Sequence, residues 1–135
     1  MMYLLDTNAC IGYLNGRAMG VVQRLKALRP QDVAVCSVVK AELFYGAIKS
    51  TNPARTLGKQ QAFLSRFVSF PFDDQAAEAY GRIRAQLASR GTPIGPNDLM
   101  IAAIAVVNDL TLVTHNTREF GRVEDLRMED WEAAV

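Results

Sequence analysis

The sequence predicts an α/β fold, an α/β/α sandwich with a central, mostly parallel sheet of four to five strands. Short apolar runs typical of buried strands alternate along the chain with longer segments that carry helix-capping residues. Strands that alternate with helices favour parallel pairing, because each helix returns the chain to the same end of the sheet. The stretch 99–107 is apolar on every side of a helix, which indicates a helix buried between other layers.

The predicted strands share short length and apolar composition. They span residues 2–5, 33–36, 68–72, 110–114 and 126–128. Most of the predicted helices begin at capping residues or at proline, and Asn15-Gly16, Pro30 and Gly91 each end one of them. They run from the caps at residues 6–8 to residue 14, and over 19–28, 37–50 with Ser37 as cap, 53–67, 73–90 with Asp73 or Asp74 as cap, and 97–107.

Length and composition indicate one globular domain, and we expect residues 1–135 to form a single domain with its own core. The net charge of +1 excludes a polycation. Residues 40–90 hold eight basic against four acidic side chains, and residues 120–135 hold two against five. This distribution permits a polyanionic partner on one face, and two ordinary solvated surfaces explain it equally well.

Cysteine usage and hydropathy indicate a soluble protein of the cytoplasm. Cys10 and Cys36 form no CxxC pair and lie among apolar residues, as reduced core cysteines do. Asp6 interrupts the apolar start after five residues, so no secretory signal is expected. The longest apolar run, 99–107, is far shorter than the roughly 20 residues needed to span a bilayer, so we expect no membrane association.

Three carboxylates have apolar surroundings. Asp6 ends the first predicted strand, and ligands of open parallel sheets bind at the carboxyl ends of strands. Glu42 shares its helix face with two valines, a tyrosine and a glycine. Asp98 begins the apolar helix. These placements allow the three side chains to converge at one edge of the sheet.

Buried carboxylates require a partner, because an isolated ionised carboxylate is costly to remove from water. No Lys or Arg at helical spacing can pair with Glu42 or Asp98. A divalent cation would relieve both the desolvation and the mutual repulsion, and Mg²⁺ or Mn²⁺ prefers such oxygen ligands. It could also activate water for phosphodiester cleavage. Taken singly, Asp6 and Asp98 are better explained as helix caps than as ligands, and Glu42 as the partner of a distant arginine, and only the three together favour a site.

Polar residues flank these acids. Thr7, Asn8 and Ser37 lie at strand-to-helix junctions, where they could hydrogen-bond ligand carboxylates or waters, or serve as caps. Lys40 and Arg118 are the basic residues best placed to contact phosphates. The single histidine, His115, lies in a polar loop, and a metal-bound water would need no histidine base.

Four blocks occur in order along nearly the whole chain. They are LLDTN at 4–8, SVVKAEL at 37–43, PNDLMIA at 96–102 and LVTHNTREF at 112–120. Together they resemble the PIN domain, and most closely the VapC toxins of bacterial toxin–antitoxin pairs. The stretches AELFYGA at 41–47 and GPNDL at 95–99 are most similar to the subgroup that cuts initiator tRNA.

The resemblance implies a Mg²⁺- or Mn²⁺-dependent endoribonuclease with a PIN-like sandwich fold, in which Asp6, Glu42 and Asp98 are catalytic and hold the metal. It implies a substrate of structured RNA, a tRNA anticodon stem-loop, and hence inhibition of translation until an antitoxin binds. It also implies a homodimer, or a larger assembly with a VapB-type antitoxin that inserts a basic side chain near the acids.

The last block departs from the family pattern. Many relatives carry a fourth acid where this chain has Asn116, with Glu119 three residues later. The Asn116 amide oxygen could still hold a metal-bound water. Thr114 is expected to orient a ligand or a water. Because of this departure, the sequence does not predict whether a second metal ion binds in the absence of RNA.

Two other classes of function stay open. A non-catalytic PIN-like module for RNA or protein binding is supported by the missing fourth acid and opposed by the three intact ones. A phosphatase with an aspartyl nucleophile would use Asp6, but such enzymes have a second Asp two residues later, where this chain has Asn8. No glycine-rich phosphate loop of the P-loop or dinucleotide type is present either.

Overall fold

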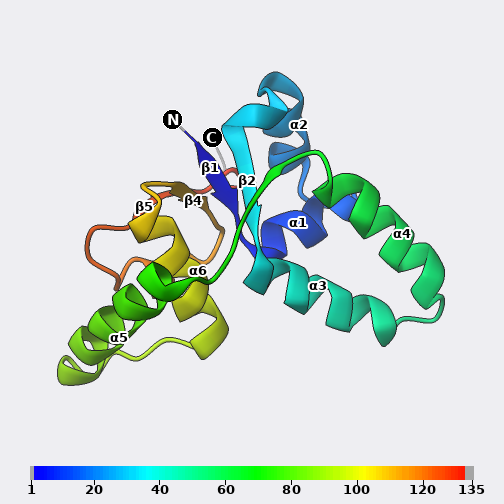
Figure 1. Ribbon diagram of the computed structural model, residues 1–135. Coiled ribbons are helices and arrows are strands. Elements are labelled where there is room, and N and C mark those ends of the chain that lie inside the picture. Colours follow the sequence, from blue (N-terminus) through cyan, green and yellow to red (C-terminus); the bar gives the residue numbers. More distant parts are fainter. Residues whose placement is uncertain (1, 133–135) are drawn as a thin grey trace.

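The centre of the fold is a five-stranded sheet in which all neighbouring strands are parallel. The computed structural model describes residues 2–132 (Figure 1). The strands are β1 (Tyr3–Leu5), β2 (Val33–Cys36), β3 (Val68–Phe70), β4 (Thr111–Val113) and β5 (Arg127–Glu129). Their order across the sheet is β3-β2-β1-β4-β5. The predicted α/β class and the parallel sheet are confirmed, and the sheet is parallel throughout.

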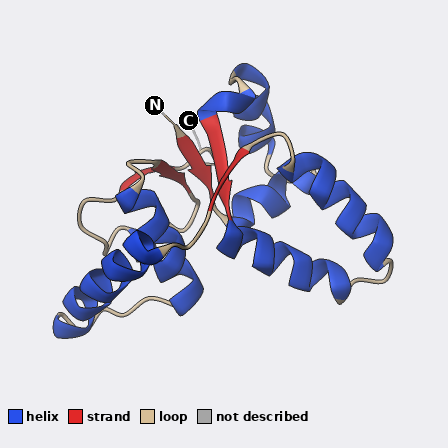
Figure 2. Ribbon diagram, viewed as in Figure 1, coloured by secondary structure: helices blue, strands red, loops and turns tan. Residues whose placement is uncertain are grey.

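Helices cover both faces of this sheet (Figures 1 and 2). They are α1 (Thr7–Leu14), α2 (Met19–Ala27), α3 (Ser37–Ile48), α4 (Pro53–Leu64), α5 (Asp74–Ser89), α6 (Pro96–Val107) and α7 (Thr117–Phe120), with a 3₁₀ turn η1 (Pro30–Asp32) before β2. The chain runs from β1 outward to β3 and then crosses back to β4, on the other side of β1. Because such crossovers are right-handed, this reversal puts α5 and α6 on the face opposite α1–α4.

The core lies between the sheet and these helices. Leu4, Val35 and Leu112, from the three central strands, are fully buried. In α6, Leu99 and the whole segment 101–105 are also buried, which confirms the helix predicted from its apolar composition. The predicted core cysteines, Cys10 and Cys36, are free and buried.

Two helix starts differ from the sequence prediction. Ser37 is the first residue of α3 and does not cap it; Cys36, the last residue of β2, holds the cap position without a side-chain bond. Pro96 begins α6, since its fixed φ suits the first helical position, so Asp98 lies inside the first turn. The cap explanation is therefore wrong for Asp98, whose carboxylate is free for another role.

Other boundaries moved because the deciding contacts are tertiary. The fourth helix ends at Leu64 and not near Phe67, since the chain turns there and buries Phe67 before β3. The last strand begins at Arg127 and not at 126, because pairing with β4 sets its register. The short elements η1 and α7 were not predicted. In the described part of the chain, no helix is long and apolar enough to cross a membrane.

Gly20 permits a close approach between α2 and the end of the chain. A Cβ at Gly20 would lie 1.9 Å from the backbone oxygen of Trp131, which cannot rotate away as a side chain could. Gly20→Ala should therefore lower the free energy of unfolding by about 2 kcal/mol or more. Urea denaturation monitored by circular dichroism would measure this change.

Gly81 provides the matched control. It lies inside α5, and a Cβ there would meet no atom within 4 Å. Gly81→Ala should raise the free energy of unfolding by about 0.5–1 kcal/mol, since alanine favours the helix. Equal stability of the two variants would contradict the packing of α2 against Trp131.

Candidate active site

The predicted site lies where the strand order reverses. Asp6 follows β1 directly, and its backbone N–H donates to the Val113 carbonyl of β4 at 3.1 Å. From β1 the chain proceeds to β2 on one side, while β4, on the other side, is reached only later. In open α/β sheets the crevice at this switch point, outside the carboxyl ends of the strands, is where ligands bind.

Asp6 is both a helix cap and a buried acid. Its carboxylate accepts a hydrogen bond from the Ala9 N–H at 2.8 Å, and the side chain is only 4% exposed. Burial raises the pKa of Asp6 to about 6, although hydrogen bonds from the Thr114 hydroxyl and the Ala9 N–H act in the opposite direction. The negative charges of Asp98 and Glu132 raise this pKa further. Asp6 is therefore held in place at an electrostatic cost.

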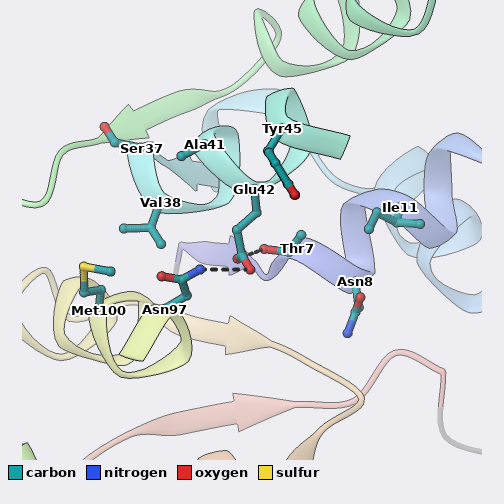
Figure 3. Close-up of a pocket in the computed structure, with 10 residues that line it drawn as sticks. All are labelled: Thr7, Asn8, Ile11, Ser37, Val38, Ala41, Glu42, Tyr45, Asn97 and Met100. Atoms are coloured by element: carbon teal, nitrogen blue, oxygen red, sulfur yellow. Dashed lines mark hydrogen bonds between the residues drawn. The ribbon is translucent and has the colours of Figure 1, made fainter. Parts of the chain in front are cut away.

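Glu42 projects from α3 toward the start of α1 (Figure 3). The Thr7 hydroxyl donates to one of its carboxylate oxygens at 2.5 Å. The Asn97 amide donates to the other oxygen over a longer 3.4 Å. Glu42 is half-buried and is thus fixed between α1 and α6 by two polar neighbours, one of which, Asn97, precedes Asp98 directly.

Asp98, half-buried in the first turn of α6, joins the other two acids electrostatically. Burial raises its pKa, and the negative charges of Glu42 and Glu119 raise it further. Asp98 in turn acts on Asp6. The fold therefore brings the three predicted acids to one place and adds Glu119 to them. The sequence signal for Glu119 was its position in the last of the four blocks.

Asn116, the predicted fourth position, contacts this added acid. Its side-chain amide donates to Glu119 at 3.3 Å, and its backbone N–H donates to the Thr114 hydroxyl oxygen at 3.0 Å. Thr114 is buried and bonded to Asp6, so a single chain of hydrogen bonds links Asp6 to Glu119. The role of Asn116 as a ligand stays a prediction.

Within residues 2–132, none of Asp6, Glu42 and Asp98 forms a salt bridge. Among the described residues, every charge that shifts the pKa of Asp6 or Asp98 is itself acidic. Hard carboxylate oxygens without a basic partner are a donor set that suits Mg²⁺ or Mn²⁺. Their oxygens do not form a closed cluster within 4.8 Å, which is expected while like charges repel and Thr7 and Asn97 engage Glu42.

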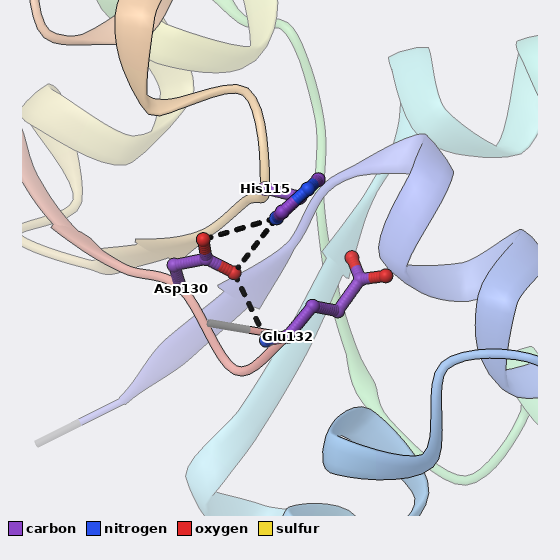
Figure 4. A group of neighbouring side chains, drawn as sticks. All are labelled: His115, Asp130 and Glu132. Atoms are coloured by element: carbon purple, nitrogen blue, oxygen red, sulfur yellow. Dashed lines mark hydrogen bonds and ion pairs between the residues drawn. The ribbon is translucent and has the colours of Figure 1, made fainter. Parts of the chain in front are cut away.

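His115, Asp130 and Glu132 do form such a close group in the described part of the chain (Figure 4). Nδ1 of His115 lies 3.0 Å from the nearer carboxylate oxygen of Asp130. The hydrogen bond with Asp130 raises the pKa of His115, as do the charges of Asp130 and Glu132. His115 is exposed, as predicted. The group lies near Asp6, since the charge of Glu132 also acts on Asp6. The sequence offered no signal for Asp130 and Glu132, which follow the last strand.

The remaining predicted residues lie around the acids. Thr7, Asn8 and Ser37 line a cleft beside Glu42. Lys40 is half-buried on α3, and Arg118 is exposed on α7. Contacts between these two side chains and RNA phosphates stay a prediction.

The chain resembles known proteins over nearly its whole length. The family model described as PIN domain matches residues 3–126. The chain is 41% identical to the tRNA(fMet)-specific endonuclease VapC of Salmonella typhimurium, over 97% of this chain and 98% of that protein. It is 44% identical, with the same coverage, to the protein of that name from Shigella flexneri.

The chain belongs to the PIN-domain family and, within it, to the VapC proteins. A solved structure of DNA-bound VapBC from Salmonella typhimurium contains a chain with the same fold, at a TM-score of 0.91 and 40% identity, with 97% of this chain and 98% of that chain covered. The resemblance inferred from the four blocks is thereby confirmed.

The buried charge of Asp6 predicts a pH-dependent stability. Its native pKa of about 6 exceeds the ordinary 3.8, so the folded state binds the proton more tightly. The ionised form therefore destabilises the fold above pH 6, by up to about 3 kcal/mol, and this penalty disappears as the pH falls toward 4. Asp6→Asn keeps a capping oxygen and should be more stable than the wild type at pH 7.5, in EDTA, but not at pH 4.

Thermal denaturation at both pH values would measure the effect. Asp74→Asn is the matched control, since it removes an exposed carboxylate from the first turn of α5 and should give no comparable stabilisation. A stability difference between wild type and Asp6→Asn that is the same at pH 4 and pH 7.5 would show that burial of the charge is not the cause.

Proposed function

We propose that this chain is a metal-dependent endoribonuclease toxin that hydrolyses a phosphodiester bond in structured RNA. Asp6, Glu42 and Asp98 are its catalytic carboxylates and would hold Mg²⁺ or Mn²⁺. One observation carries the proposal: buried and half-buried carboxylates meet at the switch point of the sheet, where the charges that shift the pKa of Asp6 and of Asp98 are acidic. Membership of a family whose relatives are named as endonucleases and ribonucleases supports it.

The chain's own residues position the reacting groups. Asp6 is fixed by the Ala9 N–H and by Thr114, and Glu42 is fixed by Thr7 and Asn97. When bound, a divalent ion supplies an activated water and neutralises the charge that develops on the phosphate. Before it binds, the acids repel the phosphates of RNA, so substrate binding and metal binding should depend on each other.

Polar neighbours complete the proposed site. Thr7 and Thr114 orient the carboxylates, and Asn8 and Ser37 face the same cleft, where they can bond waters or ribose hydroxyls. Asn116 would hold a metal-bound water, with Glu119 as the fourth carboxylate beside it. Lys40 and Arg118 would contact phosphates on either side of the scissile bond.

The proposed substrate is the anticodon stem-loop of initiator tRNA. Two relatives of about 40% identity carry the name tRNA(fMet)-specific endonuclease. Cleavage there would inhibit translation, which is the toxic effect. VapBC proteins of solved structures belong to toxin–antitoxin systems. We therefore propose a VapB-type antitoxin as the partner of this chain. The toxin that the antitoxin neutralises would be a homodimer or part of a larger toxin–antitoxin assembly.

The alternative of a non-catalytic PIN-like module loses its main support. That support was the neutral Asn116 in place of a fourth acid, and Glu119 now supplies a carboxylate whose charge acts on Asp98. Binding of Mn²⁺ separates the two functions, because a module without activity has no reason to retain carboxylate-dependent metal binding. Isothermal titration of wild type and Asp98→Asn with Mn²⁺ makes this comparison.

Asp98→Asn should reduce cleavage of initiator tRNA by roughly 100-fold or more while the fold survives, since one ligand carboxylate is lost. EDTA should abolish wild-type cleavage, and Mg²⁺ or Mn²⁺ should restore it. Purified antitoxin-free protein incubated with total tRNA, with the new RNA ends mapped by sequencing, would measure both effects.

Asp74→Asn again provides the control, because it too removes an acid from the first turn of a helix, but in α5. It should cleave at the wild-type rate. Undiminished cleavage by folded Asp98→Asn protein, or wild-type cleavage that persists in EDTA, would overturn the proposal.

A further inference from the structure

A cleft of about 700 Å³ opens beside Glu42, between α1, α3 and the start of α6 (Figure 3). Its walls differ in chemistry. Ile11, Val38 and Met100 provide apolar surface, while Asn8, Ser37 and Asn97 provide polar groups. A volume of this size can hold a nucleotide, and ligand sites commonly combine apolar walls with a few polar groups.

Tyr45 is the aromatic side chain of this cleft. It lies three residues after Glu42 on α3, so the two side chains share one helix face. Figure 3 shows the tyrosine on the side of the cleft toward which Glu42 also points. The residue is 64% exposed, although large aromatic side chains are normally well buried. Most of the Tyr45 surface is therefore open to a ligand.

A cation adjoins the ring. Nζ of Lys49, the C-cap residue directly after α3, lies over the Tyr45 ring, 5.1 Å from its centroid. Glu42, Tyr45 and Lys49 thus follow one another along α3 and its C-cap, with one acid of the site at one end and an ammonium group at the other. An RNA strand has groups that complement this order, since its phosphates can be bound by an ammonium group or by a metal ion held on carboxylates, and each ribose carries a flat base that can stack on a ring.

We propose that this cleft is a subsite for one unpaired nucleobase of the RNA, adjacent to the scissile phosphate and stacked on Tyr45. The inference rests on the proposed ribonuclease function and extends it to the form of the substrate. An unpaired base is required, because only a base turned out of a helix can present its face to a side chain. A loop nucleotide meets this condition, and one within a stem does not.

The charge of the protein favours stacking as a source of affinity. The net charge is only +1, and the acids of the site repel phosphates, so contacts between basic residues and phosphates are limited. Stacking of a base on an aromatic ring supplies binding energy that does not depend on charge. Tyr45 lies where that energy would hold the strand beside Glu42.

Binding can be tested separately from cleavage. The probe is a fluorescent anticodon stem-loop RNA in Mg²⁺, titrated with Asp98→Asn protein, which is expected to cleave roughly 100-fold or more slowly than the wild type and so leaves the RNA intact during the titration. In this background Tyr45→Phe keeps the ring and should leave the dissociation constant unchanged. Tyr45→Leu keeps apolar bulk but loses the ring face, and should weaken binding by about 5- to 100-fold.

Ile48 gives a matched control. It lies on the same helix and is also 64% exposed, but it does not line the cleft. Ile48→Ala should bind RNA as the parent does. Both positions are exposed, so the variants should fold normally, and their melting temperatures verify this.

Removing one base from the RNA should weaken binding as much as removing the Tyr45 ring from the protein does. Stem-loops with a single abasic nucleotide at each loop position should bind more weakly at one position, and Tyr45→Leu should be insensitive to that same change. Equal RNA binding by Tyr45→Leu and its parent would overturn the subsite. If Tyr45→Leu lost affinity only for the antitoxin and kept its affinity for RNA, Tyr45 would belong to a protein interface and the subsite would also be overturned. A wild-type protein that never cleaves would contradict the proposed function alone, because the binding readout does not require cleavage.

Discussion

The structure depends on one unfavourable electrostatic constraint, the burial of the Asp6 carboxylate among other acids. The carboxylate is nearly inaccessible to water, and its pKa of about 6 reflects that burial first. Hydrogen bonds from Ala9 and Thr114 reduce the cost without removing it. A chain selected for stability alone would place an amide here, which caps a helix equally well. The charged carboxylate lowers the stability of the fold, and functional sites commonly keep such destabilising groups because activity requires them.

The fold holds the other acids at this place by different elements. Glu42 comes from α3 and Asp98 from the first turn of α6, on the opposite face of the sheet, so the two meet only because both helices start at the same edge. Glu119 joins them from the short helix α7. Since repulsion between these helices would grow as the acids approach, a bound cation would stabilise the packing as well as activate water.

The acids occupy only one side of the site. Beside Glu42 the surface becomes apolar, with an exposed tyrosine and a lysine next to it. A metal site by itself would cut any phosphodiester that reaches it, so selectivity has to come from the neighbouring surface. A subsite that accepts an unpaired base would direct the acids to RNA loops and away from duplex, without a strongly basic protein.

The sequence by itself determined the alternation of strands and helices, the buried α6 and the three acids. The four blocks also identified the family. Each of these is a local signal, since apolar periodicity and the type of residue at a strand end do not depend on distant contacts. Tertiary structure decided that Asp98 is no cap, that Glu119 joins Asp98, and that Asp130 and Glu132 meet His115. Convergence of residues far apart in the chain is set by crossovers and strand register, and no local pattern encodes it.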